Sequence, residues 1–532
     1  MSSATNSAKD AKPSLSVRML EGVEKVGNKL PEPFTLFLGL FLITGVVSTA
    51  MAMAGVSVEV PGKEGPETIA IKGLFTGEGL SWFTTMLGDN YIGFPPLVTV
   101  LPILLAVGVA EKTGMLAAMV RVAFGSSPRW LLPYAVGIVG VTGSIMADSA
   151  FVVIPPLAAL VFKAAGRHPV AGLLGGFAAV GAGYSTALVP TSLDALFAGI
   201  TTSVMNTLPG QEYAAVNPVS NYWFNIASSI ALAIVCGFII SRVLEPQLER
   251  INSPREKVEE AEAAKGEGTG EGEEISQYLK PAEKKALIAS LIFGAILTVV
   301  LLWAVLIPDS PWRNEEGAFL PKSPLLSSIA FIVFIYFMGM GVVYGVVVKT
   351  VTKMADVVDM MGKALIDMIS FLVLAFILGQ FIALFNWTGI GSWIAVTGAE
   401  GLKAANLTGF PVIIGFILLA SVLNLFIISG SSMWTIMAGV FVPMFALIGL
   451  EPAFVQAAFR VGDSATQVIT PLNPYMIVIL GLLRRYEPEA GIGTLVSRML
   501  PFVIPFWITW AALLAIWYFL DLPLGPGNGI FL

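Results

Sequence analysis

Long, uninterrupted apolar runs dominate the amino-acid sequence and constrain the fold more than any other feature. Four of them, Pro33–Met53, 224–240, 286–307 and 501–520, reach or approach the ~20 residues that an α-helix needs to span a hydrocarbon core. Only 12% of the residues are charged, which is about half the proportion expected of a soluble domain. The strands of a membrane β-barrel would alternate in polarity over about ten residues, and these runs do not. The sequence therefore predicts an all-α polytopic membrane protein.

Nine transmembrane helices are predicted, together with two apolar segments that carry a small polar tip between two arms. The helices lie near residues 34–54, 95–113, 169–203, 222–243, 284–307, 324–347, 365–386, 453–483 and 499–520. The two segments, 130–164 and 408–449, are predicted to be re-entrant helical hairpins, which do not change the side of the membrane. Of the 30 Lys and Arg residues, 24 then fall in loops on the amino-terminal side, five on the other side and one within a span. By the positive-inside rule the amino terminus is cytoplasmic and the carboxyl terminus periplasmic, in a bacterial inner membrane.

The predicted spans form two halves joined by a polar linker. Residues 1–33 form a cytoplasmic segment, in which no cleavable signal peptide is visible. The first half covers 34–244 and the second covers 284–523. Between them, residues 245–283 are rich in Glu, Lys and Gly, which predicts a solvated, acidic cytoplasmic linker.

The two hairpins, and the spans that follow them, resemble each other in sequence. In each hairpin a tip serine, Ser144 or Ser432, is followed eleven residues later by a proline. The next spans read GYSTALVPTSLD over 183–194 and GDSATQVITPLN over 462–473, which share Gly, Ser, Val, Thr and Leu and end in Asp opposite Asn. On the predicted topology the hairpins enter from opposite sides, so the halves are inverted repeats with broken helices. Such repeats place substrate and ion sites near the bilayer midplane.

Broken helices inside a membrane expose backbone groups that need partners. Freed carbonyls together with Ser, Thr, Asn and Asp oxygens make a cation site, and new helix amino termini attract an anion. The simpler interpretation of these polar residues is that they cap helix ends. The candidates for binding a coupling ion are Ser144, Asp148, Ser185, Asp194, Ser432, Ser464 and Asn473.

Charged residues within the spans are few and costly, so each one needs an explanation. Arg460 and Asp463 lie three residues apart on one helix face and can pair, either as a structural salt bridge or to hold a substrate carboxylate. Asp194 has no cation near it in the sequence, which favours a role in ion or proton coupling over that of a satisfied core residue. Trp434 directly follows the second tip, where a packing role and an aromatic platform for a planar substrate both remain open. His168 lies in a short basic stretch and is predicted to be a loop residue.

Several segments resemble the AbgT family of p-aminobenzoyl-glutamate transporters. They are 147–157, 166–169, 194–201 and 460–464, and the resemblance runs over almost the whole chain. It implies nine spans plus two re-entrant hairpins in a bowl-shaped homodimer, and transport of p-aminobenzoyl-glutamate, with export of sulfonamide antimetabolites by some members. The family's functional positions correspond here to Asp194, Ser431, Trp434, Arg460, Asp463 and Pro471, with Pro452 a further match, and the repeat adds Asn473. The first tip reads Thr-Gly-Ser rather than containing Asn, a departure that bears on ion binding there.

The leading hypothesis is a secondary transporter, a symporter or antiporter driven by a proton or sodium gradient. The alternative is an ion-coupled dicarboxylate or amino-acid carrier on a related hairpin fold. No HExxH motif, nucleophile elbow or P-loop occurs, so neither an enzyme nor an ATP-driven pump is expected. The single cysteine, Cys236, leaves no cysteine-based metal site. We therefore expect no cofactor beyond Na⁺ or H⁺ as coupling ion, and a small molecule and membrane lipid, not nucleic acid, as partners.

Overall fold

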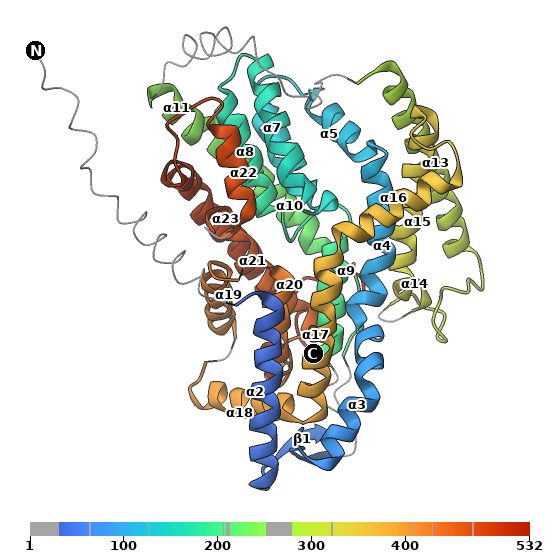
Figure 1. Ribbon diagram of the computed structural model, residues 1–532, viewed down its shortest axis with the longest axis vertical. Helices are drawn as coiled ribbons and strands as arrows, with labels where there is room; N and C mark the ends of the chain where they lie inside the picture. Colours follow the sequence, from blue (N-terminus) through green and yellow to red (C-terminus); the bar gives the residue numbers. More distant parts are fainter. Residues whose placement is uncertain are drawn as a thin grey trace, which may run out of the picture.

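The computed structural model is a mostly helical protein with one small β-hairpin (Figure 1). The structure describes residues 31–62, 65–125, 127–205, 207–208, 213–251, 279–320, 323–407, 409–427, 429–470 and 473–532. Most of the predicted linker, residues 252–278, lies outside this part of the chain, as does Pro471. The helix α11, Glu245–Ile251, leads into that linker, and α13, Pro281–Leu306, follows it.

Within the described residues, seven helices are long and apolar enough to cross a membrane. They are α2 (Pro33–Met53), α3 with α4 (Gly77–Lys112), α10 with its extension (Tyr222–Arg250), α13 (Pro281–Leu306), α15 (Ile329–Val348), α17 (Ile369–Trp387) and α23 (Ile492–Leu520). A bent pair, Pro452–Ile469 with Pro474–Leu483, makes an eighth candidate. The span predicted over 169–203 consists of two 14-residue helices, each too short to cross alone. The count of nine therefore remains a prediction.

Both predicted hairpin segments consist of two short apolar helices. The first contains α6 (Leu132–Thr142), the 3₁₀ turn η1 (Gly143–Met146) and α7 (Ser149–Ala164). The second contains α19 (Phe410–Asn424) and α20 (Gly430–Ala446). The polar tips separate the two helices in each case. Re-entry into the membrane remains a prediction for both.

Each hairpin is followed by a helix that breaks and restarts. In the first repeat α8 (Pro169–Ala182) ends at Gly183, and α9 (Ser192–Met205) begins after a non-helical stretch. In the second, α21 (Pro452–Ala465) passes through the 3₁₀ turn η3 (Gln467–Ile469) before α22 (Pro474–Leu483) begins. Proline in each connection removes a backbone donor and prevents the helix from continuing. The breaks place backbone carbonyls and polar side chains in the interior.

Several elements were not predicted as separate units. The strands β1 (Ser57–Gly62) and β2 (Gly65–Ala70) pair antiparallel next to α18 (Ile390–Ala404). The helix α16 (Met354–Asp367) is amphipathic and runs into α17, and α5 (Met115–Gly125) connects α4 to the first hairpin. A short helix, α14 (Pro324–Ser327), precedes α15. These segments are too short or too polar to stand out as spans, since hydropathy detects length and apolarity together.

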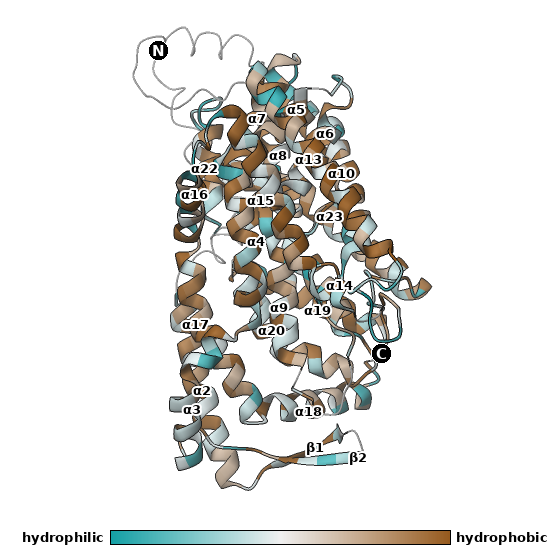
Figure 2. Ribbon diagram, turned by 90° about the vertical axis from the view of Figure 1, so that its right-hand side faces the viewer, coloured by the Kyte–Doolittle hydropathy of each residue, from teal (hydrophilic) through white to brown (hydrophobic). Residues whose placement is uncertain are grey.

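The helices α8, α20 and α21 are largely buried and form the interior, and other helices pack around them. α7 packs on α8, α4 on α9, and α20 on both α9 and α21. Large apolar side chains remain exposed on the outer helices, for example Val299 of α13 at 66% and Ile508 of α23 at 56%. Figure 2 shows this hydrophobic colouring along the helices, while the loops are more polar. A hydrophobic exterior over a polar-centred interior is the arrangement that lipid requires.

Candidate functional site

The break between α8 and α9 holds Asp194 firmly at the start of α9. The Asp194 carboxylate accepts hydrogen bonds from the backbone N and the Oγ1 of Thr191, both at 2.8 Å. Thr191 Oγ1 in turn accepts from the backbone N of Asp194 at 3.3 Å, so the two residues form a reciprocal cap at the helix start. Asn225 of α10 donates from Nδ2 to the same carboxylate at 3.0 Å. The local sequence therefore fixes this carboxylate before any cation reaches it.

Arg460 of α21 reaches across the repeat interface into this break. Its Nη1 lies 2.8 Å from Asp194 Oδ1 and donates to the carbonyl of Ser185 at 2.6 Å. The two charged side chains are 1% and 3% exposed, so this is a buried ion pair. The guanidinium also lies 5.2 Å from the centre of the Phe197 ring, a cation–π contact. Arg460 thus joins both sides of the first break from the second repeat.

This arrangement corrects two expectations from the sequence. The ion pair that Arg460 forms is with Asp194 rather than with Asp463, its neighbour three residues along the helix. Asp194, for which the sequence shows no nearby cation, receives one from 266 residues away along the chain. The reason is that α21 of the second repeat packs against α8 and α9 of the first, a contact that the spacing of neighbouring residues does not show.

Asp463 lies beside the pair and is held by the same serine. Its Oδ2 accepts from Ser185 Oγ at 3.0 Å, while the Ser185 carbonyl accepts from Arg460. Gly430, the first residue of α20, comes close to this carboxylate, because a Cβ there would lie 3.2 Å from Asp463 Oδ2. Asn424 at the end of α19 donates to the Asp463 carbonyl. Ser185 therefore links Asp463 to Arg460, the partner of Asp194, and the start of α20 lies next to Asp463.

Trp434 is part of the packed interior in this structure. The side chain is fully buried, and its Nε1 donates to Thr201 Oγ1 at 3.1 Å and to the Phe197 carbonyl at 3.3 Å. Its ring lies 4.6 Å from that of Phe459, centre to centre. Of the two interpretations left open by the sequence, the contacts favour packing over a platform exposed to substrate.

Two amides in this network were not singled out from the sequence. Asn225 holds Asp194, and Gln456, one turn before Arg460, lies between Thr201 and the guanidinium. With its amide oriented to satisfy these neighbours, the Gln456 oxygen accepts from Arg460 Nη2 at 3.2 Å. Uncharged amides within otherwise apolar helices are the signal that would have identified both residues.

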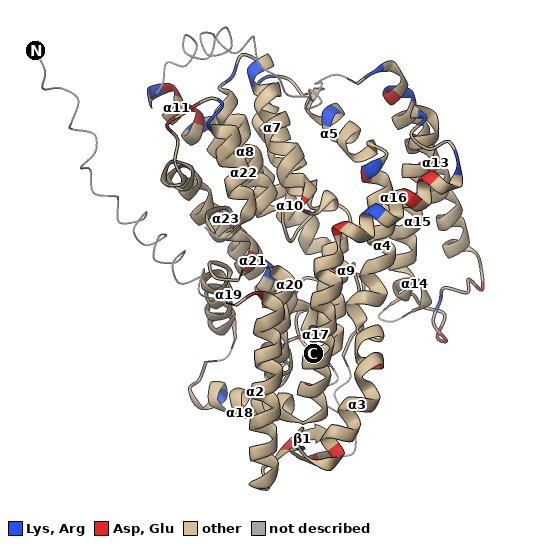
Figure 3. Cartoon of the chain, in the orientation of Figure 1, with Lys and Arg blue, Asp and Glu red and all other residues tan. Residues whose placement is uncertain are grey.

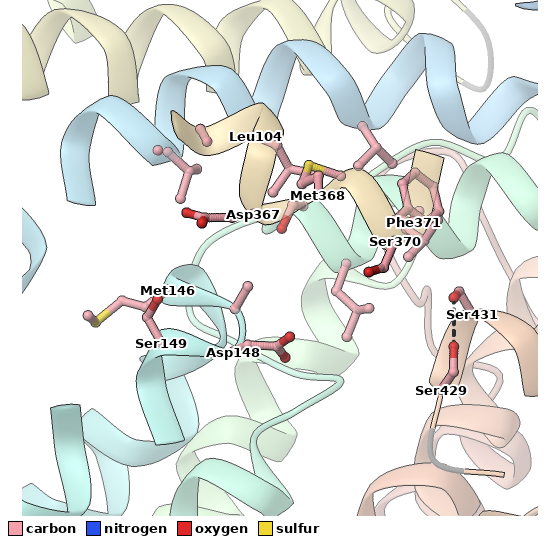
Figure 4. A pocket seen from close by; sticks show the side chains of 18 of the residues that line it. Leu104, Met146, Asp148, Ser149, Asp367, Met368, Ser370, Phe371, Ser429 and Ser431 are labelled. Carbon is pink, nitrogen blue, oxygen red and sulfur yellow. Dashed lines mark hydrogen bonds between the residues drawn. The ribbon is translucent and has the colours of Figure 1, made fainter. Parts of the chain in front are cut away.

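A cavity of about 1160 Å³ opens beside this buried network, between the tips of the two hairpins (Figure 4). Three of the predicted site residues line it, namely Ser144, Asp148 and Ser431. Ser431 shares a 3.1 Å hydrogen bond with Ser429, and Ser144 Oγ donates to the carbonyl of Thr186 at 3.0 Å. Charged residues missed by the sequence reasoning also line the cavity: Glu32, Glu111, Lys112 and Asp367. Both repeats thus contribute to one space.

The remaining predicted residues lie away from the cavity lining. Asn473 is buried and caps α22, because its Oδ1 accepts from the backbone N of Tyr475 at 3.0 Å. Ser432 donates to Ser429 Oγ at 2.9 Å and belongs to the second tip. Ser464 is fully buried on α21, next to Asp463. The capping interpretation therefore holds for Asn473, while Ser432 and Ser464 lie close to the breaks.

His168, the single histidine, lies outside this site, directly before α8. Burial lowers its pKa, and the charges that act on it are Glu245, Glu249 and Glu487, which raise it, and Arg498, which lowers it. It therefore lies near the ion pairs Arg167–Glu245 and Arg498–Glu487.

Two pairs of short apolar helices, two broken helices and a charge pair buried between the two repeats are typical of a membrane transport protein. The comparison with protein families agrees: the chain belongs to the AbgT putative transporter family, whose model matches residues 18–532. It is 34% identical over 515 residues to the p-aminobenzoyl-glutamate transport protein of Escherichia coli (strain K12), covering 97% of each chain.

Two solved structures resemble the whole fold. The crystal structure of the Alcanivorax borkumensis YdaH transporter, described as having an unusual topology, matches with a TM-score of 0.84 and 34% identity. That match covers 93% of this chain and 100% of YdaH. Neisseria gonorrhoeae MtrF, described with a class of antimetabolite efflux pumps, matches with a TM-score of 0.87 and 36% identity, covering 96% and 100% of the two chains.

Proposed function

We propose that this protein is a secondary transporter of p-aminobenzoyl-glutamate and related folate-type compounds, including sulfonamide antimetabolites that it exports. The observation that carries the proposal is the cavity between the hairpin tips, next to an ion pair that joins the two repeats. Its volume of about 1160 Å³ is sufficient for a drug-sized solute, since such sites typically measure about 300–1,000 Å³. The names of the Escherichia coli relative and of MtrF support this substrate class.

The buried pair suggests how a carboxylate substrate would be recognised. Arg460 holds Asp194 in this conformation, and Asp194 keeps three other donors, two from Thr191 and one from Asn225. A substrate carboxylate could replace Asp194 at the guanidinium while those donors continue to satisfy the aspartate. Such an exchange, with the second hairpin carrying Gly430 away from Asp463, would link substrate binding to opening of the repeat interface.

Buried oxygens near the second break support coupling to a cation. Within the described residues, Asn424 Oδ1, Asp463 Oδ1, Ser464 Oγ and Gln467 Oε1 are buried and have no hydrogen-bond partner. Oxygen ligands of this kind suit a hard cation, and an unpartnered carboxylate oxygen also suits a proton. We therefore include a proton or sodium gradient as the driving force.

The membrane arrangement belongs to the same proposal. Lys and Arg gather around α5, α11, α13 and α16, whereas the end near β1 has few (Figure 3). This asymmetry supports a cytoplasmic amino terminus and a periplasmic carboxyl terminus in a bacterial inner membrane. Nine spans with two re-entrant hairpins, in a homodimer, complete the proposed architecture.

The decisive experiment is uptake of labelled p-aminobenzoyl-glutamate into proteoliposomes under separately imposed proton and sodium gradients. Saturable flux under one of the two gradients is expected, together with counterflow, which separates a carrier from a channel. Arg460→Gln should abolish the flux, whereas Arg242→Gln, a change at an exposed arginine near the end of α10, should leave it unchanged. Absence of flux under either gradient, from correctly folded protein, would refute the proposed substrate.

A further inference from the structure

One wall of the cavity is built from a carboxylate and aromatic side chains that take no part in the Arg460–Asp194 ion pair. Asp148, Phe151, Tyr184 and Tyr475 all line the cavity. Asp148 and Phe151 belong to the first hairpin, Tyr184 to the first break and Tyr475 to α22, so both repeats build this wall. It combines one carboxylate with three aromatic rings.

The Asp148 side chain is directed into the cavity. It is exposed rather than buried in the interior, and Figure 4 shows it facing the open space, with Asp367 and Ser370 on the other side. The preceding residue, Ala147, has φ 45° and ψ −130°, a region that residues with a side chain rarely adopt. Backbone strain of this kind is retained where it positions a functional group.

The aromatic part of the wall is rigid. The rings of Phe151 and Tyr475 stack with centres 4.7 Å apart and planes 5° from parallel. The Tyr475 side chain lies close enough to the Asp148 carboxylate for the two to interact electrostatically. An ionised carboxylate has about four acceptor positions, so Asp148 retains capacity for further donors.

Tyr184 connects this wall to the buried network. A Cβ on Gly430 would lie 3.1 Å from Tyr184 Cε1 and 3.2 Å from Asp463 Oδ2. Tyr184, which lines the cavity, and Asp463, which does not, are thus both neighbours of the same glycine, so the wall is adjacent to the buried network. A solute in the cavity beside Tyr184 would have Asp148 as a carboxylate acceptor, while the next residue, Ser185, accepts from the Arg460 guanidinium.

We propose that Asp148, Phe151, Tyr184 and Tyr475 form the subsite for the 4-aminophenyl group of the substrate. The aromatic wall packs against the ring, and Asp148 accepts a hydrogen bond from the amino group. This assignment rests on the proposed function and deepens it, because the glutamate end would then face Arg460. A small hydrated cation would need several oxygen ligands, whereas this wall offers rings beside one carboxylate.

The test compares two ligands that differ only in the amino group, p-aminobenzoyl-glutamate and benzoyl-glutamate. Their binding to the purified full-length protein in detergent is measured by titration calorimetry. The wild type should prefer the amino compound by about 10- to 100-fold, the effect of one hydrogen bond to a charged acceptor. Asp148→Asn should remove most of this preference while leaving binding of benzoyl-glutamate nearly unchanged.

Two further variants make the result specific. Tyr475→Phe keeps the ring and removes the hydroxyl, so it should reduce the preference less than Asp148→Asn. Asp367→Asn removes another carboxylate from the cavity lining, one that pairs with Lys112 at 2.7 Å, and should leave the preference intact. An equal loss for both ligands in Asp148→Asn, or a change in sodium or proton dependence shared by both, would overturn the subsite. If the wild type binds neither ligand, both the proposed substrate and the proposed subsite are refuted.

Discussion

Removing one member of the buried Arg460–Asp194 pair should destabilise the protein to different extents depending on which member is removed. Without Arg460, Asp194 still accepts from Thr191 twice and from Asn225 once. Without a charged Asp194, Arg460 keeps the Ser185 carbonyl and the Gln456 oxygen, both uncharged acceptors. The arginine is therefore more dependent on its partner than the aspartate.

The magnitudes follow from burial, since the side chains are only 1% and 3% exposed. Asp194→Asn leaves a buried, uncompensated cation and should lower the free energy of unfolding by about 3–5 kcal/mol. Arg460→Met removes one charged hydrogen bond from a carboxylate that stays satisfied, which should cost about 1.5–3 kcal/mol. The double variant has no charge left to compensate, so it should be more stable than the sum of the single effects predicts, by about 2 kcal/mol.

Equilibrium unfolding in mixed detergent micelles, followed by tryptophan fluorescence, measures all four proteins of this cycle. Gradient-driven flux should be lost in every variant. The double variant should also lack flux, because it regains stability but still lacks the charged side chains at positions 194 and 460. The reasoning would be refuted if the single effects added to within about 0.5 kcal/mol, or if Arg460→Met cost more than Asp194→Asn.

Three further outcomes are expected. Trp434→Ala should lower the free energy of unfolding by about 3–5 kcal/mol, because the buried indole packs on Phe459. It should also reduce the flux of aromatic and non-aromatic substrates alike. A selective loss of p-aminobenzoyl-glutamate transport would instead indicate that the indole stacks on the substrate ring. The pKa of His168 is lowered in the folded protein, so the unfolded chain binds a proton at this side chain more readily, and the free energy of unfolding should fall as the pH drops below about 6.5. The unfolding temperature of His168→Gln, measured between about pH 7.5 and 5.5, should therefore depend less on pH than that of the wild type. The same pH dependence in both proteins would contradict this. Gly199→Ala should lower the unfolding temperature, because the added Cβ would lie 2.7 Å from the Pro96 backbone. Gly39→Ala serves as the control, because a Cβ at that position has no other atom within 4 Å. Equal unfolding temperatures for the two variants would show that α9 can move away from α4.

Much of the fold could be predicted because membrane helices are recorded locally in the sequence. The predicted span 34–54 corresponds to α2 at Pro33–Met53, and 365–386 corresponds to α17 at Ile369–Trp387. The span predicted from residue 95 misses α3, because the charged and polar residues of Gly77–Ile92 dilute its hydropathy. Prolines and clustered polar residues likewise indicated both helix breaks.

The candidate site was predictable by residue type but not by contact. Asp194, Arg460 and Asp463 were identified because charge within an apolar span is rare. Their contacts were not predictable, since i,i+3 spacing allows Arg460 to pair with Asp463, whereas the structure pairs Arg460 with Asp194. Lys112 and Asp367 were overlooked, because residues at the ends of spans are ordinarily solvated.

The sequence by itself determined that this chain is a helical membrane protein with two related halves, each carrying a polar tip and a broken helix. Those features depend on apolar length, proline and local polarity, all of which are properties of neighbouring residues. The tertiary structure alone decided which carboxylate neutralises Arg460, that Trp434 is packed away, and that Asp148 faces a cavity shared by both repeats. Such contacts join residues that are far apart along the chain, and they form only when the two halves pack against each other and exclude water from the groups between them.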